Sequence, residues 1–277
     1  MNRLLTILSV VLIFSSLQLS AQTKRALVIG IGEQVDKSWA KINGDKDVPL
    51  VQQMLRNAGY KDVRALVNKQ ATKAGIVSAF KKLSSQCEAG DVVYIQFSGH
   101  GQLVTDVNGD EDDGWDEAWI PYDAYLKYGK NDRGEKHLID DEINILLTSI
   151  RNKIGDKGKM LVVVDACHSG DSSRGNDDEV VRGVKDEFTI PIKKKRRSVK
   201  APELWITLSA CEDFQINQEM KMPKVGKLTY ALYMLPKDGT LTFESIENFM
   251  VRYRSRLPQT PVLTGDVLNI KLSDFLK

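Results

Sequence analysis

Two short segments place a thiol and an imidazole directly after apolar, β-branched runs. The segment Leu161–Gly170 reads Leu-Val-Val-Val-Asp-Ala-Cys-His-Ser-Gly and carries Cys167, while Asp91–Gly101 carries His100 just past its own apolar run. A cysteine thiolate is a strong nucleophile, and a nearby histidine can take its proton and later return it to a leaving amine. The pair therefore predicts covalent catalysis, with Cys167 as the nucleophile and His100 as base and then acid.

A lone cysteine is more often a small buried apolar residue than a nucleophile. The surroundings favour the catalytic interpretation here, because glycines lie close to both residues in the sequence, at positions 99, 101 and 170. Glycine at a strand end lets the backbone approach a ligand closely, which a merely structural cysteine does not need.

The two apolar runs are typical of parallel strands covered on both faces, and open α/β sheets place their chemistry just past the carboxyl ends of such strands. Further strands are predicted over 24–31, 63–67 and 204–208, and helices over 47–58, 72–86, 140–150, 228–235 and 243–256. This alternation predicts an α/β fold: a mixed, mostly parallel sheet of about six strands with helices on both faces.

Phe-Ser-Gly-His-Gly at 97–101 and Asp-Ala-Cys-His-Ser-Gly at 165–170 together resemble the caspase-like cysteine peptidases, most closely bacterial metacaspases. The resemblance extends over nearly all of residues 22–277. It implies a caspase-like fold, a Cys167–His100 dyad and cysteine endopeptidase activity. It also implies that the backbone amides of Gly101 and Cys167 bind the oxyanion, which a tetrahedral intermediate requires.

A carboxylate near the nucleophile suggests the preferred substrate. Asp165 lies two residues before Cys167, hence on the same face of an extended strand, and a buried carboxylate there favours a cation, ideally a bidentate arginine. The resemblance adds Asp47 and Ser98 to this pocket and implies protein or peptide substrates cut after arginine or lysine. Simpler roles stay open: Asp165 capping backbone amides, Asp47 capping a helix, and Ser98 shaping a turn.

Residues 106–117 form an acidic loop, rich in the hard oxygen donors that Ca²⁺ prefers. It is a poor EF-hand, because Glu111 stands where the turn needs glycine and no flanking helices are evident. A solvated acidic loop is the alternative. By resemblance, three aspartates match ligands of calcium-activated metacaspases: Asp116, Asp140 and Asp141. Arg174 stands where those enzymes carry a fourth aspartate, so the sequence leaves calcium as a cofactor open.

Residues 171–202 form a long polar loop that contains the basic run 193–197. Such a run is usually a solvated face. In a peptidase that cuts after basic residues it is also a substrate. We therefore expect cleavage in this loop, by the enzyme itself or by another basic-specific protease, into a larger amino-terminal and a smaller carboxyl-terminal fragment.

Residues 1–21 have the form of a signal peptide, with one early charge at Arg3, an apolar stretch and Leu-Ser-Ala before Gln22. This predicts an exported, periplasmic or extracellular protein with no stable membrane anchor and a single domain over 22–277. A net charge of +2 gives no case for nucleic-acid binding, and the resemblance implies a monomer. Three cysteines do not make a disulfide framework, although a Cys87–Cys211 bridge stays open.

Two other functions compete with an active endopeptidase of the metacaspase type. A catalytically idle caspase-like scaffold or peptide-binding module would keep the fold, but the intact Cys-His pair argues against it. A clostripain-like or gingipain-like peptidase would use the same pair on a related core. The position of Asp165 before Cys167 favours the metacaspase type.

Overall fold

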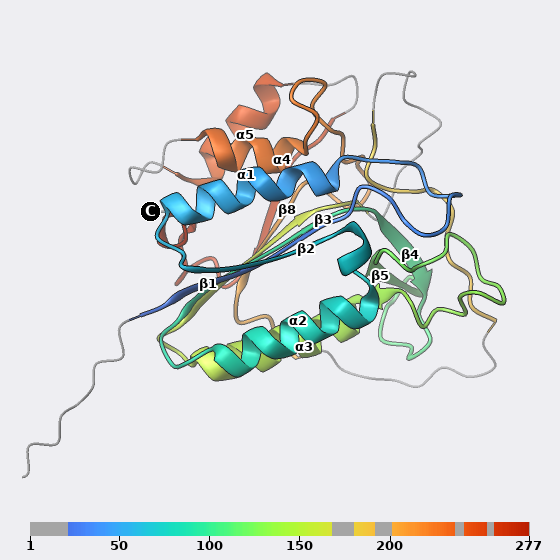
Figure 1. Ribbon diagram of the computed structural model, residues 1–277, viewed down its shortest axis with the longest axis horizontal. Coiled ribbons are helices and arrows are strands. Elements are labelled where there is room, and N and C mark those ends of the chain that lie inside the picture. Colours follow the sequence, from blue (N-terminus) through green and yellow to red (C-terminus); the bar gives the residue numbers. More distant parts are fainter. Residues whose placement is uncertain (1–21, 168–179, 192–200, 236–240, 254–257, 277) are drawn as a thin grey trace, which may run out of the picture.

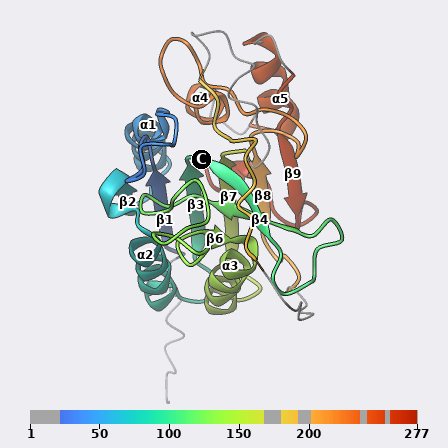
Figure 2. The same ribbon diagram turned by 90° about the vertical axis from the view of Figure 1, so that its right-hand side faces the viewer.

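The computed structural model describes residues 22–167, 180–191, 201–235, 241–253 and 258–276. Its main sheet has six strands in the order β2-β1-β3-β7-β8-β9, seen in Figure 2. Their bounds are β1 Lys24–Gly30, β2 Asp62–Val67, β3 Val92–Ser98, β7 Lys159–Asp165, β8 Ile206–Ser209 and β9 Val262–Gly265. All neighbouring pairs are parallel except β8 with β9, which is antiparallel. The predicted mixed, mostly parallel six-stranded fold is confirmed.

Helices cover both faces of this sheet (Figure 1). One face carries α1 (Gly44–Asn57), α4 (Lys227–Met234) and α5 (Phe243–Arg252), and the other carries α2 (Lys73–Gln86) and α3 (Asp140–Ile154). The described residues also form two 3₁₀ turns, η1 (Asn68–Gln70) and η2 (Leu272–Asp274). Within the described ranges, no helix is both long and apolar enough to cross a membrane.

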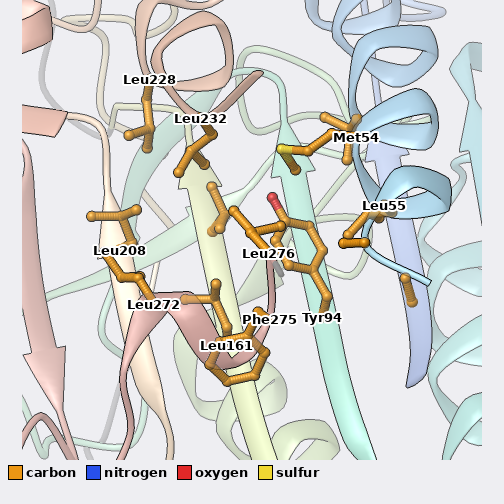
Figure 3. Close-up of a cluster of buried hydrophobic side chains, with 14 of the residues drawn as sticks. Met54, Leu55, Tyr94, Leu161, Leu208, Leu228, Leu232, Leu272, Phe275 and Leu276 are labelled. Carbon is orange, nitrogen blue, oxygen red and sulfur yellow. The ribbon is translucent and has the colours of Figure 1, made fainter. Parts of the chain in front are cut away.

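Two apolar cores fix the central strands between these helix layers. Successive side chains of a strand point to opposite faces, so Tyr94 of β3 enters the core under α1 and α4 while Ile95 enters the core over α2 and α3. Figure 3 shows the first core: Met54, Leu55, Tyr94, Leu161, Leu208, Leu228, Leu232, Leu272, Phe275 and Leu276. Each large apolar side chain buried in this way contributes about 1.5–3 kcal/mol. The ends of β3 and β7 are therefore held firmly.

The start of α1 differs from its prediction. The helix begins at Gly44 rather than Asp47, and Asn43 occupies the N-cap position, so the alternative role of Asp47 as a helix cap is wrong. Gly44 packs closely against the end of β3, where an added Cβ would lie 2.4 Å from the Ser98 carbonyl oxygen. This close packing starts the helix earlier and places Asp47 in its first turn, buried near the ends of the strands.

A second, three-stranded antiparallel sheet was not predicted. It consists of β4 (Gly101–Thr105), β5 (Trp115–Trp119) and β6 (Leu138–Ile139), in that order. Strand β4 begins directly after His100, and the acidic loop joins β4 to β5. These strands are short and interleave polar with apolar residues, so the sequence pattern gave no clear signal for them.

Candidate active site

Two neighbouring strands deliver the predicted thiol and imidazole to one edge of the main sheet. Strands β3 and β7 are parallel and in register, with Ser98 paired to Asp165. His100 and Cys167 therefore follow equivalent positions of adjacent strands, and the amide of Gly99 donates to the Asp165 carbonyl at 3.4 Å. Both side chains are buried. The shared register explains how residues distant in the sequence reach one site.

The surroundings of His100 define its tautomer. Its Nε2 lies 2.8 Å from the carbonyl oxygen of Ala40, which can only accept a hydrogen bond. Burial lowers the pKa of His100 to about 4, although the Ala40 hydrogen bond opposes this effect. The ring is therefore neutral at pH 7 with its proton on Nε2. Its buried Nδ1 has no hydrogen-bond partner among the described residues, so it is an available base.

The thiol of Cys167 lies near the backbone carbonyl group of Gln215 and a second thiol. Its Sγ donates to the carbonyl oxygen of Gln215 at 2.9 Å, and the Cys211 Sγ lies 3.8 Å from the same oxygen. A hydrogen bond to Cys167, together with burial, keeps the pKa of the Cys211 thiol well above its usual range. None of Cys87, Cys167 and Cys211 is in a disulfide, so the Cys87–Cys211 bridge left open by the sequence is not formed.

A buried arginine lies against both predicted pocket aspartates. The two terminal nitrogens of Arg182 lie 2.6 and 3.2 Å from the carboxylate oxygens of Asp47, and one of them lies 3.2 Å from Asp165 Oδ1. The Nε of Arg182 donates to Glu219 Oε1 at 2.9 Å. The Arg182 side chain is fully buried, so three carboxylates surround this cation without exposing it to solvent. Neither Arg182 nor Glu219 was predicted as a site residue.

Burial governs the charges in this pocket. It raises the pKa of Asp47, against the attraction of Arg182, because an isolated carboxylate is poorly stabilised away from water. Burial also opposes the charge of Arg182, but attraction by Asp47, Asp165 and Glu219 raises its pKa well above the usual range. The acidic pocket is therefore suited to a buried cation.

Hydrogen bonds hold the pocket carboxylates in place. Asp165 accepts from the Asn217 side-chain amide at 2.8 Å and from the Thr229 hydroxyl and amide at 2.6 and 2.9 Å. Asp47 accepts from the Gly226 amide at 2.9 Å. Asp165 thus binds a backbone amide, as the simpler interpretation expected, and contacts the cation as well.

Ser98 lies at the end of β3 in a buried polar network. Its hydroxyl oxygen accepts from Gln96 Nε2 at 3.1 Å, and the same nitrogen donates to the Thr229 hydroxyl at 2.8 Å. Tyr94 donates to Gln96 Oε1 at 2.6 Å. In the described part of the chain, Ser98 is therefore linked to the pocket indirectly, by hydrogen bonds through Gln96 and Thr229.

The two predicted oxyanion donors face the same segment of the chain. The amide of Cys167 donates to the carbonyl oxygen of Arg182 at 2.8 Å. The amide of Ile120 donates to the His100 carbonyl. In an antiparallel ladder, hydrogen-bonded and non-hydrogen-bonded pairs alternate. The next pair, Gly101 with Trp119, is therefore not hydrogen-bonded, and the amide of Gly101 points away from β5. On that side of β4, Phe188 pairs with Val104 in an isolated parallel bridge.

The acidic loop gathers three aspartates at the far end of β4. Carboxylate oxygens of Asp106, Asp110 and Asp116 lie within 4.8 Å of one another. Asp116 is buried, and neither of its oxygens has a hydrogen-bond partner among the described residues. Burial, with repulsion from neighbouring aspartates that include Asp140 and Asp141, raises the pKa of Asp116 to about 8. An unpartnered carboxylate among like charges fits a bound cation.

This loop joins two antiparallel strands, which excludes an EF-hand with its flanking helices. Of the three aspartates that lie together, only Asp116 is one of the predicted calcium ligands. The other two, Asp106 and Asp110, were not indicated by the resemblance. Asp140 and Asp141 lie in the first turn of α3.

The predicted signal peptide, Arg174 and the basic run 193–197 lie outside the described residues.

Comparisons with known proteins agree with this arrangement. A family model described as "Metacaspase, peptidase C14 domain" matches residues 24–173. Metacaspase-1A of Aspergillus oryzae is 30% identical over 158 residues, which make up 53% of this chain and 35% of that protein. Metacaspase-1B of Aspergillus fumigatus is 35% identical over 100 residues, 36% of this chain and 22% of that protein.

A solved structure extends the likeness over the whole fold. Protein GSU0716 from Geobacter sulfurreducens has a TM-score of 0.63 and 25% sequence identity, covering 92% of this chain and 97% of that one. The chain spans about a third or less of the length of the two curated fungal relatives. The matched family segment includes both strand ends that carry His100 and Cys167. The chain belongs to the metacaspase family, as a peptidase C14 domain.

Proposed function

We propose that this protein is a cysteine endopeptidase that cleaves peptide bonds after arginine and, less efficiently, after lysine. The observation that carries the proposal is the buried Arg182 guanidinium among Asp47, Asp165 and Glu219, next to the nucleophile. A buried cation held by several charge-assisted hydrogen bonds indicates which substrate side chain such a pocket accepts. Family membership supports the hydrolytic chemistry.

In the proposed reaction, the Cys167 thiol transfers its proton to Nδ1 of His100 as Sγ attacks the scissile carbonyl. The backbone amides of Cys167 and Gly101 donate to the developing oxyanion. His100 then gives the proton to the leaving amine, and a thioester forms on Cys167. Water, deprotonated by His100, hydrolyses the thioester. The hydrogen bond from Nε2 to the Ala40 carbonyl supports this exchange, since it keeps Nδ1 as the accepting nitrogen.

The pocket geometry favours arginine over lysine. Asp47 accepts hydrogen bonds from both terminal nitrogens of the Arg182 guanidinium, and Glu219 accepts one from its Nε at the same time. A lysine ammonium is a single point charge without an equivalent of Nε. Lysine would therefore leave Glu219 buried without its cationic donor, and cleavage after lysine should be slower.

We also propose a calcium site built from Asp116 with Asp106 and Asp110, near Asp140 and Asp141. The unpartnered, buried carboxylate of Asp116 supports it, because hard carboxylate oxygens suit this ion. Bound calcium would supply positive charge that neutralises the aspartates and would hold the loop between β4 and β5. The residues that catalyse hydrolysis in our proposal lie outside this cluster.

One experiment tests the activity. Purified residues 22–277 and the Cys167→Ala variant are assayed on fluorogenic peptides ending in arginine, lysine or aspartate, with calcium or with a chelator. Cleavage after arginine that is lost in Cys167→Ala supports the proposal. Cleavage only after aspartate would contradict the pocket assignment. Binding of arginine peptides without hydrolysis under any condition would favour the scaffold alternative.

The proposed setting follows from residues 1–21, which have the form of a signal peptide. We propose that the protein is exported and acts as a monomer. Amino-terminal sequencing of the native protein should begin at Gln22, and sedimentation should give the mass of one chain.

A further inference from the structure

The segment 180–183 contacts the site in the way a bound substrate would. Building on the proposed function, we infer that this segment is the enzyme's own tethered substrate and that the Arg182–Gly183 bond is the site of self-cleavage. The basic run 193–197, which the sequence suggested, is not needed for this event.

The backbone before the bond pairs with residues 217–219. The Arg182 amide donates to the Asn217 carbonyl at 2.9 Å, and the Glu219 amide donates to the Val180 carbonyl at 3.0 Å. Val181 and Gln218 form an antiparallel bridge. Recognition of an extended peptide through main-chain hydrogen bonds is common, because such bonds accept many sequences.

The side chain and the carbonyl group of Arg182 satisfy the two specific requirements of a scissile residue. The guanidinium fills the acidic pocket, and the carbonyl oxygen accepts from the Cys167 amide at 2.8 Å. One residue thus supplies both the thiol and an amide that holds the carbonyl to be attacked. A purely structural ion pair would explain the guanidinium, but it would not require the carbonyl at this position.

The chain after the bond is anchored as well. Gly183 is buried, and Phe188 is fully buried with its amide donating to the Leu103 carbonyl at 2.8 Å. The Asp186 carbonyl accepts from Gln102 Nε2 at 2.6 Å. Strand β4 therefore holds the leaving side, while residues 217–219 hold the acyl side. The bond is fixed between two anchors beside Cys167.

The reaction balances without any co-reactant other than water. Sγ of Cys167 bonds to the carbonyl carbon of Arg182 as its proton passes to His100. The bond to the Gly183 nitrogen breaks, and that nitrogen takes the proton and becomes a new amino terminus. Water then hydrolyses the thioester, which leaves a carboxylate on Arg182 and restores the thiol. Cleavage gives fragments 22–182 and 183–277.

Cleavage also controls access to the site. Before the cut, Arg182 occupies the acidic pocket, so external arginine peptides must compete with a tethered group. The smaller fragment retains Asn217 and Glu219, which contact the larger fragment through Asp165 and Asn43. The two fragments should therefore stay associated, while the new carboxyl terminus at Arg182 can leave the pocket.

The test follows the mass and amino terminus of each fragment in freshly purified wild type, Cys167→Ala, Arg182→Ala and Arg182→Lys. Lys185→Ala is the matched control, because Lys185 is a nearby basic residue with an exposed side chain. We expect wild type and Lys185→Ala to yield a fragment that begins at Gly183. Cys167→Ala and Arg182→Ala should remain uncut at this bond, and Arg182→Lys should be cut at least tenfold more slowly.

Two further measurements separate the possible failures. The rate of cutting should not change over a hundredfold dilution, since the substrate is tethered. Arginine-peptide hydrolysis by wild type should rise as the cut proceeds. Peptidase activity with no fragment beginning at Gly183 would overturn the self-cleavage site and leave the proposed function intact. Folded wild type that shows neither self-cleavage nor hydrolysis of arginine peptides would overturn the proposed function. Uncut wild type that is fully active on peptides would overturn the control of access.

Discussion

The Cys167 amide and the Arg182 carbonyl oxygen are joined by a hydrogen bond of 2.8 Å, and the Arg182 side chain lies in the acidic pocket at the same time. This relationship connects the predicted nucleophile with the predicted specificity. It defines where a scissile carbonyl and its preceding side chain can lie.

Removal of the base should abolish most of the activity. General acid–base groups typically contribute about 10²–10⁴-fold to a rate, so His100→Ala should lower kcat on arginine peptides by an amount in this range. The measurement is peptide hydrolysis at saturating substrate. Thermal unfolding of the variant serves as the control for folding. An unchanged kcat would show that His100 is not the base.

Glu219 should discriminate arginine from lysine. Its carboxylate accepts from Nε of the bound arginine, a donor that lysine lacks. A hydrogen bond to a charged group contributes about 1.5–3 kcal/mol, so Glu219→Gln should lower kcat/KM for arginine peptides roughly 10- to 100-fold and affect lysine peptides less. Glu244→Gln, at an exposed position on α5, is the control. An unchanged ratio of arginine to lysine cleavage would count against the assignment.

Gly226 should be essential for an open pocket. A Cβ at this position would lie 2.1 Å from Asp165 Oδ2 and 2.6 Å from a terminal nitrogen of Arg182. Gly226→Ala should therefore reduce arginine-peptide hydrolysis at least tenfold, while iodoacetamide still labels Cys167. Gly129→Ala is the matched control, because a Cβ there meets nothing within 4 Å. Wild-type kinetics in Gly226→Ala would refute the pocket geometry.

His100 should titrate far below an ordinary histidine. Burial lowers its pKa to about 4 in the folded protein, whereas unfolded histidine has a pKa near 6.5. Between these values the unfolded state binds more protons, so the stability contributed by neutral His100 is present above pH 6.5 and declines as the pH falls toward 4. Each pKa unit corresponds to about 1.4 kcal/mol.

Nitrogen NMR of the Cys167→Ala variant measures this titration directly, with His100→Asn used to assign the signal. The spectrum should show a neutral ring protonated on Nε2 at pH 6. A midpoint at pH 6 or above would contradict the effect of burial on His100, and a proton on Nδ1 would contradict the role of the Ala40 contact.

Calcium should act through Asp116. Asp116→Asn removes a buried carboxylate charge from the cluster, so it should abolish both the calcium-induced rise in melting temperature and any calcium dependence of hydrolysis. Asp112→Asn is a matched control on an exposed residue of the same loop. Isothermal calorimetry gives the binding stoichiometry. Equal calcium binding by wild type and Asp116→Asn would place any site elsewhere.

Local patterns determined much of this protein. Uninterrupted apolar runs identified the central strands, and capping and periodicity identified the helices, as with Thr72, whose hydroxyl accepts from the Gly75 amide at the start of α2. Because parallel strands end at a common edge, the sequence also predicted that Cys167 and His100 belong to one site, with Asp165 beside them. Each strand and helix was identified from residues close together in the chain, and the pairing of Cys167 with His100 followed from the general rule that parallel strands share an edge.

Only the tertiary structure decided which distant groups complete the site. The Ala40 carbonyl that sets the His100 tautomer lies 60 residues away in the sequence, and Asp47 meets Arg182 across 135 residues. No local pattern identifies such partners, because a backbone carbonyl has no sequence signature and a single arginine in a polar loop resembles any solvated charge. Packing of α1 and of residues 217–219 around the strand ends brought these groups together, and with them the tethered Arg182.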